Sequence, residues 1–281
     1  MKVLVTGASG FLGHAVVRAA AAAGHQVIAL VRPTADVGRL AWPESVEVVT
    51  GDLRQKGAWR DRLQPDVVVH LAAAPSGDLA TQFAGTVQAT ENLLDCLPLK
   101  ALRRFVHISS FSVYDYSSRP RRGTIDETAA LEPKPEARDA YTITKMLQER
   151  LVAERCADAG LECIIIRPGA IYGPGKDWDY GTAVGFKSLD LLFGPFGAFR
   201  LTYVDNCADA IVKAIDAEVG TARVFNIVDD DCPSLWKFHN ACRRAGCVGS
   251  SLPLFRRREM LQRRTREMHH VPRRPRGLIP G

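Results

Sequence analysis

Two residues of a predicted helix carry groups that can exchange protons. Tyr141 and Lys145 are four positions apart, so on a helix they lie on one face, one turn from each other. A free phenol, with a pKa of about 10, is a poor acid or base at neutral pH. A neighbouring ammonium favours the phenolate and lowers this pKa, which makes proton exchange with a hydroxyl or carbonyl oxygen feasible near neutrality.

A hydroxyl at the end of a predicted strand can hold the same oxygen. Residues 105–110 read Phe-Val-His-Ile-Ser-Ser, an apolar strand that ends in Ser109 and Ser110. Ser110, Tyr141 and Lys145 therefore form a set that can bind an oxygen and protonate it. Taken alone, a tyrosine and a lysine at this spacing are equally consistent with a chance surface pair, since both residue types are common.

Three glycines near the N-terminus indicate what such a set would work beside. Gly7, Gly10 and Gly13 follow the apolar run of residues 3–5 and precede a helical pattern. A strand, a glycine turn and a helix let backbone amides approach a diphosphate, to which the helix N-terminus offers partial positive charge. The turn predicts dinucleotide binding, with a glycine turn that holds no ligand as the alternative. The positive charge of an oxidised nicotinamide would also favour the Tyr141 phenolate.

The end of the second predicted strand, over 26–31, indicates which dinucleotide. A carboxylate there bonds the ribose hydroxyls and selects NAD, whereas a nearby arginine accommodates the extra phosphate of NADP. Arg32 occupies this place, and the first carboxylate follows only at Asp36. We therefore expect NADP, with NAD as the alternative in which Arg32 is an ordinary loop residue.

Strands and helices alternate along the chain. Besides residues 3–5 and 26–31, we expect strands over 46–50, 65–74, 105–110, 161–167 and 224–228, with helices over 11–23, 81–97, 140–159, 205–217 and 235–245. This alternation predicts an α/β fold with a Rossmann-type, doubly wound parallel sheet. Ligands then bind at the carboxyl ends of the strands, where Asp52, the alanines 72–74 and Ser110 converge. His70, inside the fourth strand, we interpret as a packed strand-end residue and not as a base.

The length of 281 residues allows one large α/β domain with a small appendage. We expect a dinucleotide-binding domain over 1–167, to which 205–230 return, and a small C-terminal substrate-binding lobe over 168–254. A basic, poorly ordered tail is expected over 255–281. Residues 115–137 are polar and proline-containing, which predicts a long functional loop over one end of the sheet.

Composition excludes several classes of protein. No run of 18 apolar residues is present and the chain enters a strand without a signal peptide ahead of it, so we expect a cytoplasmic protein without a membrane span. Seven scattered cysteines without a Cys-x-x-Cys pair indicate reduced thiols and no metal site. The net charge of +6 stems from residues 255–281, which hold nine arginines and two glutamates. Such a tail can bind nucleic acid or anionic membrane; we favour a solvated terminus and expect no nucleic-acid partner.

Seven stretches, in this order, resemble the motifs of extended short-chain dehydrogenases/reductases, also called the NAD-dependent epimerase/dehydratase family. They are Thr6 to Gly13, Asp52-Leu53, His70 to Ala73, Ser109 to Tyr114, Tyr141 to Lys145, Arg167 to Pro174 and Tyr203 to Asp209. Together they are far more specific than any one of them. The resemblance implies an NAD(P)-dependent enzyme with a small-molecule substrate, and by analogy a homodimer through helices such as 81–97 and 140–159, the latter with an apolar stripe.

The resemblance also implies roles for individual residues. Ser110 is the catalytic serine, Tyr141 the acid/base, and Lys145 the group that lowers the pKa of Tyr141 and holds the nicotinamide ribose. Asp52 and Leu53 would flank the adenine. The full set expected at the cofactor is Gly7, Gly10, Phe11, Leu12, Gly13, Arg32, Asp52, Leu53, Leu71, Ala72, Ala73, Ser109, Tyr141, Lys145 and Pro168.

Departures from the family pattern bear on the substrate. Family dehydratases place an Asp-Glu pair where this chain has Phe111 and Ser112, so we do not expect dehydration. Many nucleotide-sugar members have an asparagine at the position of Ala170, which weakens a nucleotide-sugar substrate. Asp115 replaces a usual glycine, and Arg200 lies near, but not at, the position of a diphosphate-binding arginine. After the last motif the chain continues for fewer residues than in family members, so we expect a short or unusual substrate lobe.

Three functions remain in competition at this point. The leading hypothesis is an NADP-preferring oxidoreductase that transfers hydride to or from a carbonyl or secondary alcohol. The second is a nucleotide-sugar epimerase of the same family, in which the hydride returns to the other face of the sugar. The third, from another class, is a cofactor-binding regulator or nucleic-acid-associated protein without catalysis, motivated by the basic tail and the short lobe.

Overall fold

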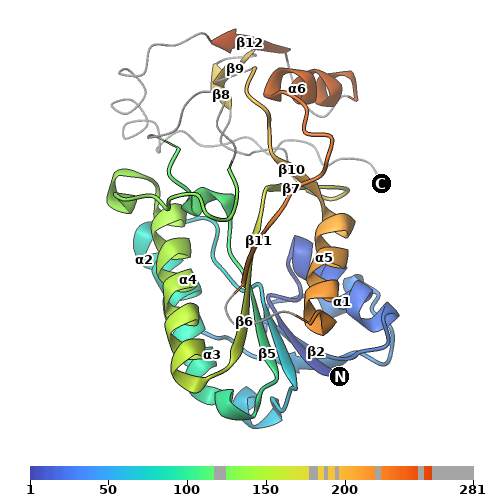
Figure 1. Ribbon diagram of the computed structural model, residues 1–281. Helices are drawn as coiled ribbons and strands as arrows, with labels where there is room; N and C mark the ends of the chain where they lie inside the picture. Colours follow the sequence, from blue (N-terminus) through green and yellow to red (C-terminus); the bar gives the residue numbers. More distant parts are fainter. Residues whose placement is uncertain are drawn as a thin grey trace. The chain divides into compact units, whose positions relative to one another are not determined.

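The computed structural model describes residues 1–116, 125–176, 183–186, 189–193, 196–218, 223–245 and 250–254 (Figure 1). They form two compact units. The first consists of Met1–Ile171 and Val204–Ile227, and the second of the described residues between 172 and 203 and after 227. The predicted basic tail over 255–281 lies outside the described residues, as does the tip of the long loop at 117–124.

The first unit is built on a seven-stranded sheet in the order β11-β6-β5-β4-β1-β2-β3. Every pairing in it is parallel. Its strands are β1 (Lys2–Thr6), β2 (Gln26–Val31), β3 (Glu47–Thr50), β4 (Val67–His70), β5 (Arg104–Ile108), β6 (Glu162–Pro168) and β11 (Arg223–Ile227). The order reverses at β1, which is the doubly wound arrangement that the alternating pattern predicts. A short strand, β7 (Ala170–Tyr172), begins after Gly169.

Helices cover both faces of this sheet (Figure 1). On one face α1 (Phe11–Ala22) packs beside α5 (Val204–Asp216). On the other, α2 (Leu79–Phe83), α3 (Ala89–Cys96) and α4 (Ala140–Ala159) contact one another. Short 3₁₀ turns connect the elements, at Val37–Leu40, Ala58–Arg62, Leu99–Ala101, Phe111–Val113 and Pro135–Ala137.

The single helix predicted over 81–97 is divided in the structure. A π-helical turn, Ala84–Gln88, separates α2 from α3. A Cβ on Gly85 would lie 2.7 Å from the Cβ of Ala74, so glycine permits the close approach of the loop after β4. Thr86 Oγ1 in turn accepts a hydrogen bond from Ala74 N at 3.0 Å. The π turn therefore allows this helical segment to pack closely against the loop at the carboxyl end of β4.

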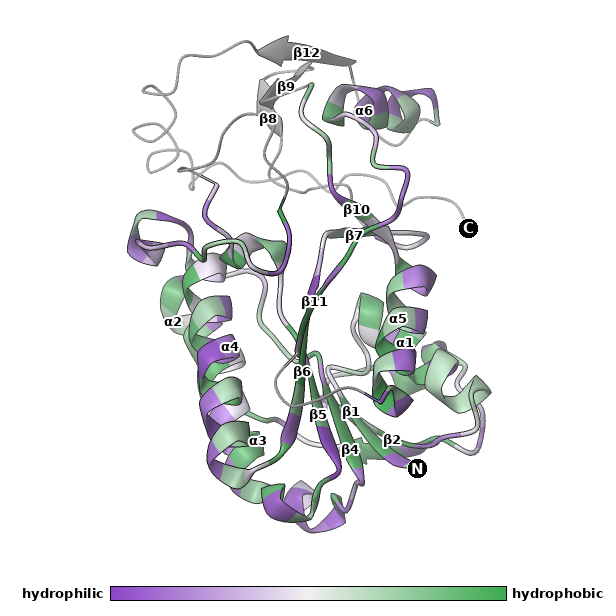
Figure 2. Ribbon diagram, viewed as in Figure 1, coloured by the Kyte–Doolittle hydropathy of each residue, from purple (hydrophilic) through white to green (hydrophobic). Residues whose placement is uncertain are grey.

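The core lies between the sheet and its helices. Strands buried on both faces read as continuous apolar runs, and the strands are mostly green in Figure 2. The buried charge of Arg104 links the sheet to α5. Arg104 donates to Glu162 and to the carbonyl oxygens of Ala214 and Ile215, both at 2.8 Å. Because these carbonyls belong to the last turn of α5, Arg104 caps that helix and holds it against β5 and β6.

The second unit contains a small three-stranded sheet. In it β9 (Leu189–Phe193) pairs in parallel with β12 (Ser250–Leu254) and antiparallel with β8 (Ala183–Phe186). The unit also holds β10 (Leu201–Tyr203) and α6 (Leu235–Arg244), whose first turn is capped by the Ser234 hydroxyl. Around Phe238 gather Tyr172 and Phe199, with edge-to-face ring contacts of 6.2 and 5.1 Å. Residues 176–203 are poorly periodic in sequence, and none of the predicted strands falls in this range.

No helix within these ranges combines the length and apolar character that a bilayer crossing requires.

Candidate active site

The turn between β1 and α1 packs tightly against the end of β4. Gly7 has φ +66°, and a Cβ on it would lie 2.9 Å from the Ala72 nitrogen. A Cβ on Gly13 would lie 2.1 Å from the Gly7 carbonyl oxygen. The helix can therefore follow this turn so closely only because residue 13 has no side chain. Gly10 closes the turn through a 2.9 Å bond from its nitrogen to Gly7 O. The predicted glycines and Ala72 are therefore brought together.

The N-terminus of α1 suits an anion. Gly10 is its N-cap, and no side chain caps the first turn and no acidic residue lies in it. Backbone N–H groups and the helix dipole are thus free of an internal carboxylate at this end. Together with the tight backbone turn that Gly7 and Gly13 permit, this end fits the diphosphate of a dinucleotide.

Two arginines surround the predicted adenine-side carboxylate. Arg54 Nη2 donates to Asp52 Oδ2 at 2.6 Å and Arg54 Nε to Asp52 Oδ1 at 3.0 Å. These bonds hold the pKa of Asp52 below its usual range, and the charge of Arg32 adds to the lowering. Asn92 Nδ2 fixes the next residue by donating to Leu53 O at 2.8 Å. Sequence reasoning found Asp52 and Arg32 but missed Arg54, although its place two residues after Asp52 in a turn was a usable signal.

The three predicted catalytic residues come together at the start of α4. Asp139 caps this helix by accepting from Thr142 N at 2.8 Å, which places Tyr141 in its first turn. The Ser110 side chain lies near enough to Tyr141 to lower the pKa of the phenol by hydrogen bonding, and Lys145 Nζ donates to Ile108 O at 2.6 Å. Because Ile108 ends β5 and Ser110 follows it, one strand end holds both members of the helical pair.

Burial sets the protonation of this group. It raises the pKa of Tyr141 above its ordinary value, although the Ser110 hydrogen bond acts in the opposite direction. It lowers the pKa of Lys145 to about 7, against a smaller opposite effect of Glu149. Both shifts favour the neutral form. In the chain by itself, the predicted lowering of the Tyr141 pKa is therefore absent, because loss of hydration outweighs the Ser110 hydrogen bond and the charge of Asp139 adds to the rise.

A buried polar layer lies behind Lys145. His70 Nδ1 is 2.7 Å from Thr6 Oγ1, and its Nε2 is 2.8 Å from Thr90 Oγ1. Gln148 joins this layer to the lysine, since its Oε1 lies 2.5 Å from Lys145 Nζ. Burial lowers the pKa of His70 to about 3, so His70 is a neutral packed residue, as its place in the strand indicated. Gln148 and Thr90 were missed because polar residues on helices read as solvent-facing.

Pro168 is held by a second buried cluster. Arg167 forms an ion pair with Glu149, and its guanidinium lies 4.8 Å from the centre of the Tyr114 ring. Tyr114 Oη donates in turn to Asn226 Oδ1 at 2.7 Å. These contacts fix the end of β6 between α4 and β11, which places Pro168 at the same sheet edge as Ser109 and Ala72. Among the described residues the buried Ser109 Oγ has no hydrogen-bond partner.

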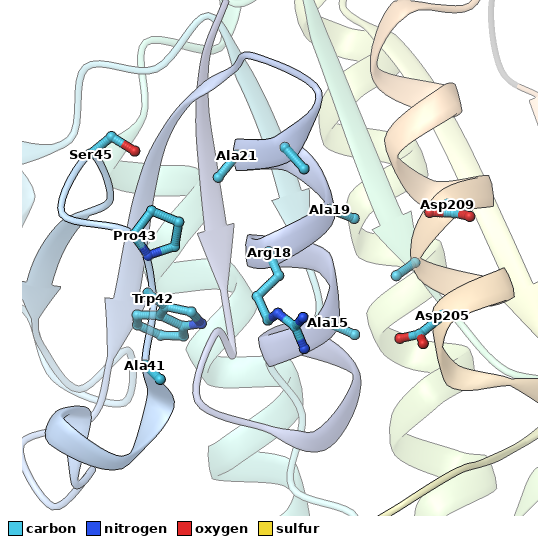
Figure 3. A pocket seen from close by; sticks show the side chains of 12 residues that line it. Ala15, Arg18, Ala19, Ala21, Ala41, Trp42, Pro43, Ser45, Asp205 and Asp209 are labelled. Atoms are coloured by element: carbon cyan, nitrogen blue, oxygen red, sulfur yellow. The ribbon is translucent and has the colours of Figure 1, made fainter.

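Arg200 and a cavity of the first unit are not part of the group described above. Arg200 belongs to the second unit. A cavity of about 610 Å³ lies elsewhere in the first unit, lined by α1, by the loop 41–45 and by α5 (Figure 3). Arg18, Trp42 and Asp205 face it, and none of the predicted site residues lines it. Trp42 Nε1 donates to His14 Nδ1 at 2.9 Å, which closes the loop onto α1.

Known proteins are similar to the chain in sequence. A model of the "NAD dependent epimerase/dehydratase family" matches residues 3–187. Sterol demethylase protein B of Methylococcus capsulatus is 36% identical over 204 residues, which cover 71% of this chain and 60% of that protein. A 3-diazoavenalumate denitrifying reductase of a Streptomyces species is 32% identical over 248 residues, 82% of this chain and 77% of that protein.

The fold is also shared with solved structures. The UDP-glucuronic acid 4-epimerase of Bacillus cereus, in complex with NAD, superposes with a TM-score of 0.73 over 90% of this chain and 87% of that chain, at 24% identity. The family match covers most of the first unit, including the glycine turn, Ser110, Tyr141 and Lys145. The chain therefore belongs to the NAD-dependent epimerase/dehydratase family, the extended short-chain dehydrogenases/reductases.

Proposed function

We propose that this enzyme is an NADPH-preferring reductase of a carbonyl group, which in the reverse direction catalyses oxidation of the matching secondary alcohol. The observation that carries the proposal is the set of partly buried Ser110 and Tyr141 with buried Lys145, at the sheet edge that also holds the glycine turn. A raised pKa keeps the Tyr141 phenol protonated at neutral pH, which suits a proton donor. Reduction of a carbonyl requires such a donor at its oxygen.

In this proposal, different residues of the chain bind the cofactor and act on the substrate. The Gly7–Gly13 turn and the α1 N-terminus would hold the diphosphate, Asp52 and Leu53 the adenine side, and Pro168 the nicotinamide side. The chemistry that a bound nicotinamide supplies here is hydride transfer to or from the substrate carbon. Ser110 binds the substrate oxygen and Tyr141 gives it a proton. The remaining cofactor residues of the proposal are Gly10, Phe11, Leu12, Leu71, Ala72, Ala73 and Ser109.

The preference for NADP is proposed from charge. β2 ends in Val31, the exposed Arg32 follows it, and Arg54 hydrogen-bonds to Asp52, whose pKa the charge of Arg32 also lowers. Two cations beside one carboxylate leave a positive excess for a 2′-phosphate. Titration of the purified protein with NADPH and NADH tests this. Arg32→Ala should weaken NADPH binding about tenfold or more and leave NADH binding nearly unchanged. Tighter binding of NADH by the unaltered protein would contradict the proposal.

The catalytic assignment has its own test. Tyr141→Phe removes the proton donor and keeps the ring, so turnover should fall by roughly two to four orders of magnitude. NADPH binding should remain, because the glycine turn is untouched. Tyr116→Phe is the matched control, since it removes a hydroxyl that donates to Phe111 O at 2.9 Å from a residue outside the proposed site set. Equal turnover in Tyr141→Phe and the unaltered enzyme would overturn the assignment.

A nucleotide-sugar epimerase is the second candidate. It is favoured by the fold shared with the UDP-glucuronic acid 4-epimerase over 90% of the chain. Ala170, which replaces the asparagine of many nucleotide-sugar members, speaks against it. NAD that co-purifies tightly, together with interconversion of UDP-sugars, would support this candidate over the reductase. We do not propose a non-catalytic regulator, because such a protein would not require Ser110, Tyr141 and Lys145 to lie together.

We also propose that the enzyme is a homodimer. Leu79 and Phe83 on α2 and Leu147 on α4 are 48, 44 and 41% exposed, and these helices contact each other. Exposed apolar side chains gathered on two neighbouring helices are typical of a subunit interface. The same helices were expected to pair by the family resemblance. Light scattering coupled to size-exclusion chromatography measures the assembly directly.

A further inference from the structure

We propose that Gln148 is a positioning residue for Lys145: its buried amide holds the lysine amine in place and supplies it with a neutral contact instead of a carboxylate. The inference rests on the proposed function, in which Lys145 works beside Tyr141. Gln148 is fully buried, three positions after Lys145 on the same helix. A side chain at this spacing lies one turn away on the same face.

The contacts of Lys145 Nζ define its position. Nζ donates to Gln148 Oε1 at 2.5 Å and to Ile108 O at 2.6 Å. One acceptor comes from α4 and the other from β5, so the amine is held between a helix and a strand. Both acceptors are uncharged. A lysine buried this deeply ordinarily has a carboxylate in contact.

The amide of Gln148 has only one orientation that satisfies its neighbours. Its Nε2 donates to Ala72 O at 3.0 Å and to Thr90 Oγ1 at 2.8 Å. The Thr90 hydroxyl uses its own proton on Thr86 O, 2.6 Å away, so towards Gln148 it can only accept. Both amide protons are thereby used, and Oε1 must face the lysine. A flipped amide would place its protons against those of Lys145.

The histidine layer agrees with this orientation. Thr6 Oγ1 accepts from Ala72 N at 3.3 Å and can give its own proton to His70 Nδ1. The proton of a neutral His70 is then on Nε2, from which it is donated to Thr90 Oγ1. Thr90 thus accepts from both His70 and Gln148. Donors and acceptors thus match at Thr6, Thr90 and Lys145, and the remaining contact, 3.2 Å between Gln148 Nε2 and His70 Nε2, brings together two groups that both donate to Thr90 Oγ1.

Few charged or titratable groups among the described residues face Lys145. The side chain in contact with its Nζ is the uncharged Gln148. Glu149 and Tyr141 are on α4 with it, while His70 on β4 and His107 on β5 are buried imidazoles whose pKa values are lowered by burial. Glu149 is engaged by Arg167 through two hydrogen bonds. A carboxylate at 148 would add the first negative charge directly at Nζ. An opposite charge at this distance raises a lysine pKa by about one to three units.

Titration of the Lys145 side chain by NMR tests this without any turnover. The ε-methylene signals of ¹³C-lysine-labelled protein are followed with pH, and Lys145→Met assigns the resonance. Gln148→Glu should raise the midpoint by at least one pH unit. Gln148→Met, which removes the acceptor but keeps the length, should lower it. Opposite shifts from one position would not follow from a merely structural role.

The control is Gln88→Glu, which adds the same charge at an exposed position of the π turn and should leave the midpoint unchanged. An identical Lys145 midpoint in the unaltered protein and in Gln148→Glu would overturn the inference. If Gln148→Glu does not fold, Gln148→Met decides, and an unchanged midpoint there overturns it equally. The pH at which kcat/KM changes should move in the same direction as the NMR midpoint.

The two proposals fail in different ways. Absence of carbonyl reduction, with the Lys145 midpoint still moved by Gln148→Glu, would remove the reductase and keep the positioning role. Loss of turnover in Tyr141→Phe, with a Lys145 midpoint insensitive to position 148, would keep the reductase and remove the role of Gln148.

Discussion

Replacing Lys145 by methionine should change how the stability of the protein depends on pH. Burial lowers the pKa of Lys145 from 10.5 to about 7 in the folded chain. Between these values the unfolded chain binds the proton and the folded chain does not, so stability rises with pH across this window. Below pH 7 both states are charged and the full cost of burying the charge is present. Lys145→Met removes this titration.

The size of the effect follows from the same two pKa values. With 1.36 kcal/mol for each pKa unit, the lysine costs about 4 kcal/mol at pH 7 and about 2 kcal/mol at pH 9. The difference in unfolding free energy between Lys145→Met and the unaltered protein should therefore change by about 2 kcal/mol between these pH values, with the variant gaining at pH 7. The oxygens left without a donor on Gln148 and Ile108 cost the same at both pH values and drop out.

Urea unfolding followed by far-UV circular dichroism at pH 7 and pH 9 gives the four free energies needed. Lys100→Met, at an exposed position, controls for the loss of one lysine. The reasoning is refuted if Lys145→Met and the unaltered protein keep a constant difference in unfolding free energy across this range. A variant that gains relative stability at pH 9 would mean that the sign of the shift is wrong.

Three further changes test other parts of the structure. Gly13→Ala places a Cβ 2.1 Å from Gly7 O, so both the melting temperature and NADPH affinity should fall, whereas Gly24→Ala at an open position should cost stability alone. Arg167→Leu leaves Glu149 buried without its partner and should lower the unfolding free energy by about 3–5 kcal/mol in urea titrations; a loss under 1 kcal/mol would mean that the pair is not buried as described. Leu147→Glu should convert the proposed dimer to a monomer in light scattering, while Lys213→Glu, at an exposed position of α5 on the other face of the sheet, should not; a dimer that persists in Leu147→Glu excludes this interface.

The sheet could be predicted because its strands have a clear physical signature. Parallel strands buried on both faces are short apolar runs, and β1, β2, β4, β5 and β6 all have this form. The strand ends then placed Asp52, Ala72 and Ser110 at one edge. The strands β8, β9 and β12 were missed because glycines interrupt their surroundings and neither alternation nor a long apolar run marks them.

The environment of the catalytic residues could not be predicted from the sequence. The sheet-facing side of α4 is largely polar, with Thr142, Thr144, Lys145 and Gln148 buried on it. Such residues are read as solvent-facing unless the groups that satisfy them are known, and those groups come from β4, β5 and α3. The pKa of Tyr141 was misjudged for the same reason, since the ammonium next to it was visible in the spacing and the loss of hydration was not.

The cap that Arg104 places on α5 has a consequence for how the chain folds during synthesis. The first unit is discontinuous, so a nascent chain that ends near residue 200 has β1 to β6 but neither α5 nor β11. At that stage Arg104 lacks the carbonyl oxygens of Ala214 and Ile215. The β6 strand is then paired with β5 on one side and has no partner strand on the other. Exposed edges of this kind favour aggregation. We therefore expect premature termination before β11 to give insoluble fragments, whereas chains that extend through Ile227 can close the sheet.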